Sequence, residues 1–94
     1  MYLNYTISDS LKKKIKKISR KDILLKKALY NKINEIINSN DKTILHYKFL
    51  RHDLKSRQRV HIKKHFVLVF KYLKEEKVII FLDIDNHKNI YKEF

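Results

Sequence analysis

Residues 58–63 combine the residue types and the spacing that chemistry on a phosphate group needs. Arg59, His61 and Lys63 alternate with Val60 and Ile62, and alternate side chains of a strand project to opposite faces. The apolar pair would anchor the strand, while the three cations form a ridge on its other face. Arginine binds phosphate through paired hydrogen bonds and lysine adds a point charge. The pattern therefore predicts a phosphate-binding ridge, with a solvated sheet face as the alternative.

His61 adds a group that can move a proton. Like charges disfavour the protonated imidazole, so the cations around His61 should lower its pKa and keep the ring neutral near pH 7. A neutral imidazole can accept a proton from a hydroxyl group. The alternative is a surface histidine without a task. Further cations nearby in the sequence would extend the basic surface, and they are Lys48, Arg51, Lys55, Arg57 and Lys64.

A second polar group follows the last apolar run and consists of Asp85, His87, Lys88 and Tyr91. His87 and Tyr91 stand four residues apart, in a stretch that reads as a polar tail over residues 86–94. A tyrosine ring can stack on a base, and its hydroxyl can bond a phosphate oxygen. The structural alternative is that Tyr91 packs back onto the domain and pins the chain end.

A metal site must be weighed against these interpretations. Asp83, Asp85 and His87 alternate, and carboxylates with an imidazole could hold a divalent ion for a metal-dependent nuclease. The strand pattern ends before His87, however, and no further acidic residue lies close in sequence. The prediction is therefore a site without a metal and a protein without a cofactor.

The elements that must position these residues follow from the spacing of apolar side chains. Alternation predicts a strand over residues 2–7. Helical spacing then predicts a helix over about 9–19, whose N-cap comes from residues 8–10, and a second helix that ends near residues 38–41. Ser19 and Asp22 have capping-box spacing ahead of the second helix. That helix has an apolar stripe made of Leu25, Ala28, Leu29, Ile33, Ile36 and Ile37.

Three strand-like stretches follow the helices, over residues 58–63, 66–72 and 78–85. The middle stretch is apolar on both faces, as a central strand would be. The predicted architecture is α+β, with the order β-α-α-β-β-β and a helical hairpin packed on one face of a small, mainly antiparallel sheet.

Length and charge limit what the protein can do. A chain of 94 residues and 11.6 kDa is expected to form one domain over residues 1–94, too small to enclose a large active-site cavity. Its net charge of +13 and pI of about 10.0 point to a polyanionic partner. The charge is concentrated in residues 11–32 (+9) and 46–65 (+6), although A/T-rich codons can contribute to the lysine content.

The residues that are missing exclude several classes of protein. Without glycine, the chain has no P-loop or dinucleotide-binding turn. Without cysteine, it has no disulfide or thiolate metal site, which suits a reducing compartment. The apolar runs are too short for a membrane span, and the narrow apolar stripe of the first helix argues against a membrane-surface helix. We expect a soluble cytoplasmic protein.

With these residues in place, the chain resembles the RelE family of the RelE/ParE superfamily, the toxins of type II toxin–antitoxin pairs. The resemblance covers nearly the whole chain, and the order of elements agrees with the one predicted above. Its most specific parts are residues 46–55, 59–70 and 81–91. The chain departs from the family at Val67, where many members have an arginine.

The resemblance implies a ribosome-dependent mRNA endonuclease that cleaves in the A site. It implies metal-independent attack of a 2′-hydroxyl on the adjacent phosphate, and a cognate RelB-like antitoxin as partner. By position, Arg59, His61, His87 and Tyr91 would be the catalytic residues. The RNA-binding residues would be Lys48, Arg51, Lys55, Arg57, Lys63 and Lys64.

Two other functions remain open at this point. A ParE-like toxin would share the fold but inhibit gyrase without RNA chemistry. A basic module could instead bind RNA on the ribosome without cleaving it.

Overall fold

A four-stranded mixed sheet organises the molecule. The computed structural model describes residues 3–50 and 57–93, except for the side chains of residues 91–93. The sheet order is β1-β4-β3-β2, with β1 parallel to β4 and the other neighbours antiparallel. The predicted α+β class, order of elements and mainly antiparallel sheet are therefore confirmed. In chain order the elements are β1 (Asn4–Ile7), α1 (Asp9–Lys21), α2 (Ile23–Ile37), the short 3-10 helix η1 (Ile44–His46), β2 (Gln58–Ile62), β3 (Phe66–Leu73), β4 (Val78–Asn86) and α3 (His87–Glu93).

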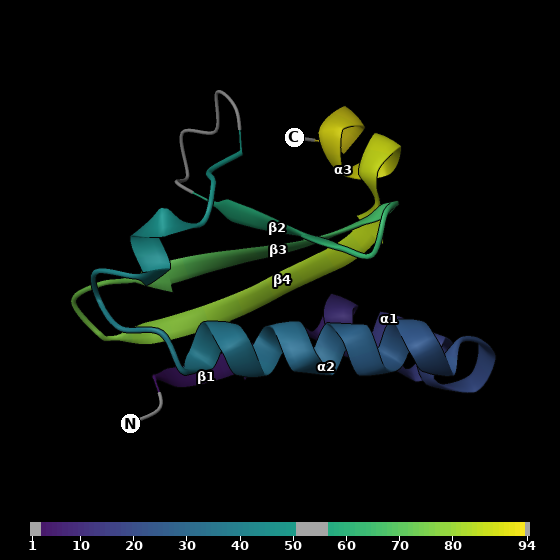
Figure 1. Cartoon of the computed structure of the whole chain (residues 1–94), viewed down its shortest axis with the longest axis horizontal. Coiled ribbons are helices and arrows are strands. Elements are labelled where there is room, and N and C mark those ends of the chain that lie inside the picture. Colours follow the sequence, from purple (N-terminus) through teal and green to yellow (C-terminus); the bar gives the residue numbers. More distant parts are fainter. Residues whose placement is uncertain (1–2, 51–56, 94) are drawn as a thin grey trace.

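The helical hairpin of α1 and α2 lies on one face of the sheet, and α3 lies on the opposite side (Figure 1). Ser8 is the N-cap of α1, since its hydroxyl oxygen accepts a hydrogen bond from the amide of Leu11 at 3.1 Å. Asp22 caps α2 in the same way, accepting from the amide of Leu25 at 3.0 Å. The predicted capping role of Ser19 is wrong, because α1 continues past it to Lys21.

The main core fills the space between the hairpin and the sheet. The predicted stripe of α2 is confirmed: its residues are buried there, apart from the half-buried Ala28. Phe70 and Phe81 are fully buried, with ring centroids 6.2 Å apart. Residues 67–70 of β3 are all buried, so β3 is the central strand that its apolar character on both faces predicted.

A smaller apolar cluster on the other face holds α3 in place. It consists of Leu50, Val67, Val69 and Ile90, with Leu82 packed against it. The predicted polar tail over residues 86–94 is therefore wrong, because residues 87–93 form α3 and Ile90 is fully buried. A helix of two turns in which, among the described side chains at residues 87–90, Ile90 is the buried apolar one has no periodic pattern that sequence reasoning could detect.

The turn between β2 and β3 corrects a second expectation. The strand ends at Ile62, and Lys63 has a left-handed backbone with φ of 55°. Lys63 therefore does not continue the ridge formed by Arg59 and His61. A left-handed conformation costs a residue other than glycine roughly 1–2 kcal/mol, and this chain contains no glycine to take the position.

Within residues 3–50 and 57–93, no helix combines the length and apolar character that crossing a bilayer requires.

Candidate functional site

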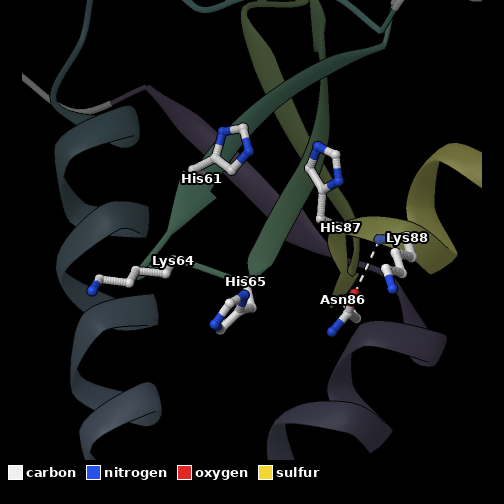
Figure 2. A pocket seen from close by; sticks show the side chains of 6 residues that line it. All are labelled: His61, Lys64, His65, Asn86, His87 and Lys88. Carbon is white, nitrogen blue, oxygen red and sulfur yellow. Dashed lines mark hydrogen bonds between the residues drawn. The ribbon is translucent and has the colours of Figure 1, made fainter.

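An open groove of about 520 Å³ lies between the β2–β3 turn and the start of α3. The groove brings together side chains from two parts of the chain that are distant in sequence (Figure 2). Its lining combines three imidazoles, two ammonium groups and one amide, and its residues are His61, Lys64, His65, Asn86, His87 and Lys88. Such a surface suits an anionic ligand that carries hydrogen-bond acceptors.

Two of the predicted catalytic residues lie side by side at this groove. His61 projects from β2 and His87 begins α3, and their rings stack with centroids 5.4 Å apart and an interplanar angle of 22°. Figure 2 shows the two imidazoles facing each other across the groove, with His65 lower down. The pair is close enough for both rings to reach the same phosphodiester.

Arg59 lies next to His61 on the same face of β2. Its Nη1 is 3.4 Å from Nδ1 of His61. A guanidinium only donates hydrogen bonds, so this contact suits an imidazole whose Nδ1 is unprotonated and whose proton is on Nε2. The backbone also fixes the position of Arg59, since its amide donates a hydrogen bond to the carbonyl of Lys48 at 2.8 Å.

The pKa of His61 is below its usual value of 6.5. Partial desolvation of the ring is the largest cause, although His61 remains exposed, and the positive charges of Arg59, His87 and Lys48 lower the pKa further. The predicted direction is confirmed, although the sequence pointed to charge alone. His61 is therefore neutral near pH 7, in the state that can accept a proton.

We expect a titration of the His61 ring, followed by NMR, to give a midpoint below 6.5. Lys48→Ala should move this midpoint upward toward 6.5, because a positive charge that disfavours the imidazolium is removed. His46 is exposed on η1 and provides the control resonance. A wild-type midpoint at or above 6.5 would contradict the assignment of His61 as the neutral partner.

The junction between β4 and α3 fixes where the helix begins, and with it the position of His87. The side-chain oxygen of Asn86 accepts a hydrogen bond from the amide of Lys88 at 3.0 Å. The amide of His87 donates to the carbonyl of His65 at 2.7 Å, which ties α3 to the β2–β3 turn. Sequence reasoning named Lys88 as a member of the polar group after the last apolar run but gave it no role. It did not include His65 or Asn86 among the site residues, because only the turn and the helix start bring them to the groove.

The other predicted residues have different positions. Lys64 lines the groove, and Lys48 is close enough to lower the pKa of His61. Lys63 is exposed in the turn between β2 and β3. Arg57 comes directly before β2, where its backbone carbonyl accepts a hydrogen bond from the amide of Leu50 at 2.9 Å. Two predicted RNA-binding residues, Arg51 and Lys55, and the side chain of the predicted catalytic Tyr91 lie outside the described part of the structure.

The metal alternative does not fit the geometry. Asp83 and Asp85 both contact the ammonium group of Lys14, at 2.8 and 3.1 Å, whereas His87 stacks on His61. Among the residues that the structure describes, no three carboxylate or imidazole side chains are grouped so that they could hold an ion. Asp83, Asp85 and His87 thus do not form a shared metal site.

At Val67, where the resemblance led us to expect an arginine, the side chain is apolar and does not line the groove. Val67 is fully buried in the small cluster with Ile90, and its direct neighbour on β2 is His61. Val67 thus supports the floor beneath His61 and α3.

Comparison with known proteins finds similarity to toxins. No family model matches the chain. It is 45% identical over 87 residues to "Putative toxin RelE4" of Methanocaldococcus jannaschii, covering 93% of this chain and 88% of that protein. It is 33% identical over 85 residues to an uncharacterized protein of Methanosarcina mazei, covering 90% of this chain and 94% of the relative.

Two solved structures share the fold. A metal-bound toxin from Helicobacter pylori matches with a TM-score of 0.73 and 22% identity, over 94% of this chain and 98% of its own. YafQ from E. coli strain BL21(DE3) matches with a TM-score of 0.70 and 16% identity, over 95% and 98%.

Proposed function

Because this chain belongs to the RelE family of toxins, we propose that it is an endoribonuclease that cleaves mRNA in the A site of cytoplasmic ribosomes and so stops translation. The observation that carries this proposal is the stacked pair of His61 and His87 beside the guanidinium of Arg59, in an open groove lined by lysines. The pair supplies two groups that can transfer protons, and the cations suit a phosphodiester.

The proposed reaction uses the two histidines in opposite roles. Neutral His61 accepts the proton of a ribose 2′-hydroxyl at Nδ1, once the guanidinium of Arg59 has turned from this nitrogen to the bound phosphate, and the 2′-oxygen forms a bond to the adjacent phosphorus. The bond between phosphorus and the 5′-oxygen breaks, and protonated His87 donates its proton to that leaving oxygen. The products are a 2′,3′-cyclic phosphate and a 5′-hydroxyl. No step of this scheme uses a metal ion.

Arg59 has a separate role in this scheme. Its guanidinium would stabilise the negative charge that develops on the phosphoryl oxygens in the transition state. Tyr91 would orient or stack the substrate. The surrounding cations would bind the RNA backbone, and they are Lys48, Arg51, Lys55, Arg57, Lys63, Lys64 and Lys88.

The test is 5′-end mapping of mRNA on programmed 70S ribosomes incubated with the purified protein. The protein is first stripped of metal with EDTA. The EDTA is then removed by dialysis, because the ribosome itself needs Mg²⁺. Cuts within the A-site codon by stripped protein, with a 5′-hydroxyl on the downstream fragment, would support the proposal. Intact mRNA together with DNA breaks in growing cells would instead identify a gyrase inhibitor. Salt-sensitive ribosome binding without any cut would identify a binding module.

We also propose a RelB-like antitoxin as partner, with acidic segments that dock on the tip of the helical hairpin. Ile23 and Leu24 are 61% and 63% exposed at this tip, which is unusual for large aliphatic side chains. Arg20 and Lys21 end α1 directly before them. A partner that combines carboxylates with apolar side chains matches this surface.

Ile23→Asp with Leu24→Asp should weaken binding of the antitoxin at least about 10-fold, because exposed apolar anchors are replaced by charges that repel an acidic partner. Folding should be retained, since acidic residues are favourable in the first turn of a helix. Leu45→Asp is the matched control, because Leu45 is 48% exposed on η1. Calorimetric titration with the antitoxin measures the effect, and equal weakening by the control would exclude the hairpin tip as the docking site.

A further inference from the structure

The start of α3 is held by a carboxylate that the proposed reaction does not use. Asp85 is near the end of β4, two residues before His87. One carboxylate oxygen, Oδ1, accepts hydrogen bonds from the amide of Asn86 at 2.7 Å and from Nδ2 of Asn89 at 3.0 Å. Asn89 lies in α3, so these two bonds clamp the junction between the strand and the helix from both sides.

The second oxygen of Asp85 fixes the carboxylate from another direction. Oδ2 accepts from the ammonium group of Lys14 at 3.1 Å, and the same group donates to the carbonyl of Ile84 at 3.3 Å. Lys14 is in α1, which packs beside β4. Both carboxylate oxygens are therefore occupied, and three elements meet at this one side chain.

The helix that carries His87 depends on such anchors. It has seven residues, and a helix this short is not stable in water without contacts to the rest of the protein. Ile90 provides an apolar contact, and the amide of His87 donates to the carbonyl of His65. The Asp85 clamp adds a polar side-chain contact to Asn89 in the first turn. If the clamp is lost, the first turn can shift while Ile90 remains buried.

The register of the sheet places the clamp in line with the histidine pair. Asp85 is paired with Val67 on β3, and Val67 is paired with His61 on β2. Side chains directly opposite each other in a sheet lie on the same face. A displacement of the chain at Asp85 is thus transmitted directly to the distance between His87 and His61.

We infer that Asp85 is a positioning residue, which sets the geometry of the catalytic pair by holding the first turn of α3 so that His87 stacks on His61. The role in catalysis rests on the proposed function, whereas the role in geometry does not. Hydrogen bonds to the charged carboxylate outweigh the effect of burial, so the pKa of Asp85 lies below its usual value and the group is ionised at neutral pH. The clamp therefore requires the carboxylate and not its neutral form.

The test compares Asp85→Ala with Asp83→Ala. Asp85→Ala removes both carboxylate oxygens and with them all three hydrogen bonds, whereas an asparagine could keep both bonds of Oδ1. Asp83 binds the same lysine at 2.8 Å, and its carboxylate accepts from its neighbour, the amide of Ile84, at 2.8 Å. Asp83→Ala thus removes a charge and an ion pair to Lys14 without touching α3, which makes it the matched control.

We expect Asp85→Ala to lose the NOE cross-peaks between the ring protons of His61 and His87, while Asp83→Ala keeps them. Single-turnover cleavage on ribosomes should fall about 10- to 100-fold for Asp85→Ala, because small misplacements of a catalytic group have effects of that size. It should stay within about 2-fold for Asp83→Ala. The apparent affinity for programmed ribosomes should stay unchanged, since the lysines of the groove remain.

The two readouts separate this inference from the proposed function. If the wild-type protein cleaves no RNA, the cross-peaks still decide whether Asp85 positions His87. Cross-peaks that persist in Asp85→Ala would overturn the inference even for an active enzyme. Equal loss of cleavage and cross-peaks in both variants would also overturn it, because the effect would then come from the ion pairs to Lys14 and not from the clamp on α3.

Discussion

His61→Ala and His87→Ala are each expected to lower the rate of mRNA cleavage on ribosomes by about 10²- to 10⁴-fold, the range that a general acid or base contributes. The two rings stack with centroids 5.4 Å apart and line one groove. Removal of either ring therefore leaves the reaction without its general base or without its general acid. The double variant should be little slower than the worse single variant, because groups that act as a unit are not additive. Single-turnover assays and growth after induction measure the effect.

His46→Ala is the matched control for this pair. His46 is exposed on η1, outside the set of residues that line the groove. It should cleave mRNA as fast as the wild-type protein and arrest growth equally. Circular dichroism should show the same folded state for all variants. Wild-type rates in both His61→Ala and His87→Ala would exclude the histidine pair as the catalytic groups.

Arg59→Ala is expected to lower the cleavage rate by about 10²- to 10³-fold, as removal of one donor to a developing anionic oxygen typically does. Arg59→Lys should recover only part of this loss, because an ammonium group cannot reproduce the planar fork that binds two phosphate oxygens. Both variants are measured in the same single-turnover assay. Arg20→Ala, which removes an exposed arginine of α1, is the control for a simple change in net charge.

Arg59 should also affect the pH dependence of the cleavage rate. A residue that only attracts RNA by its charge would not have this effect. Cleavage needs neutral His61, so the rate falls as the pH falls through the lowered pKa of that ring. The guanidinium is one cause of the lowered pKa. Arg59→Ala should therefore raise the pKa of His61, and the rate should begin to fall at a higher pH. An acid limb that does not move would mean that Arg59 acts on the substrate alone.

Much of the fold follows from local spacing. Period-2 and helical patterns placed β2, β3, β4 and the two long helices within a few residues of their observed ends, because each buries a regular stripe against the main core. Two features have no such pattern. The short α3 is held by Ile90, the buried apolar side chain among its described residues 87–90. The left-handed conformation of Lys63 is set by the tight turn between β2 and β3 rather than by its own preference.

Some residues of the candidate site were predictable, but their arrangement was not. The basic ridge of β2 was visible in the alternation around His61, and His87 stood out in the polar group that follows the last apolar run. Their contact depends on the pairing of β2, β3 and β4 and on the junction at Asn86, which no local pattern encodes. His65 reaches the groove only because the chain reverses at residues 63–65.

The contact between Ser8 and β4 has a consequence for the order in which the protein folds. The hydroxyl of Ser8 donates to the carbonyl of Leu82 at 2.7 Å across 74 residues of sequence, next to the parallel pairing of β1 with β4. Contacts between residues so distant in sequence form slowly, since a long loop must close first. The antiparallel strands from β2 to β4 are neighbours in sequence and can pair early. We therefore expect β1 to join the sheet last. The histidine pair would then form near β2, at one edge of the sheet, before β1 has paired at the other edge.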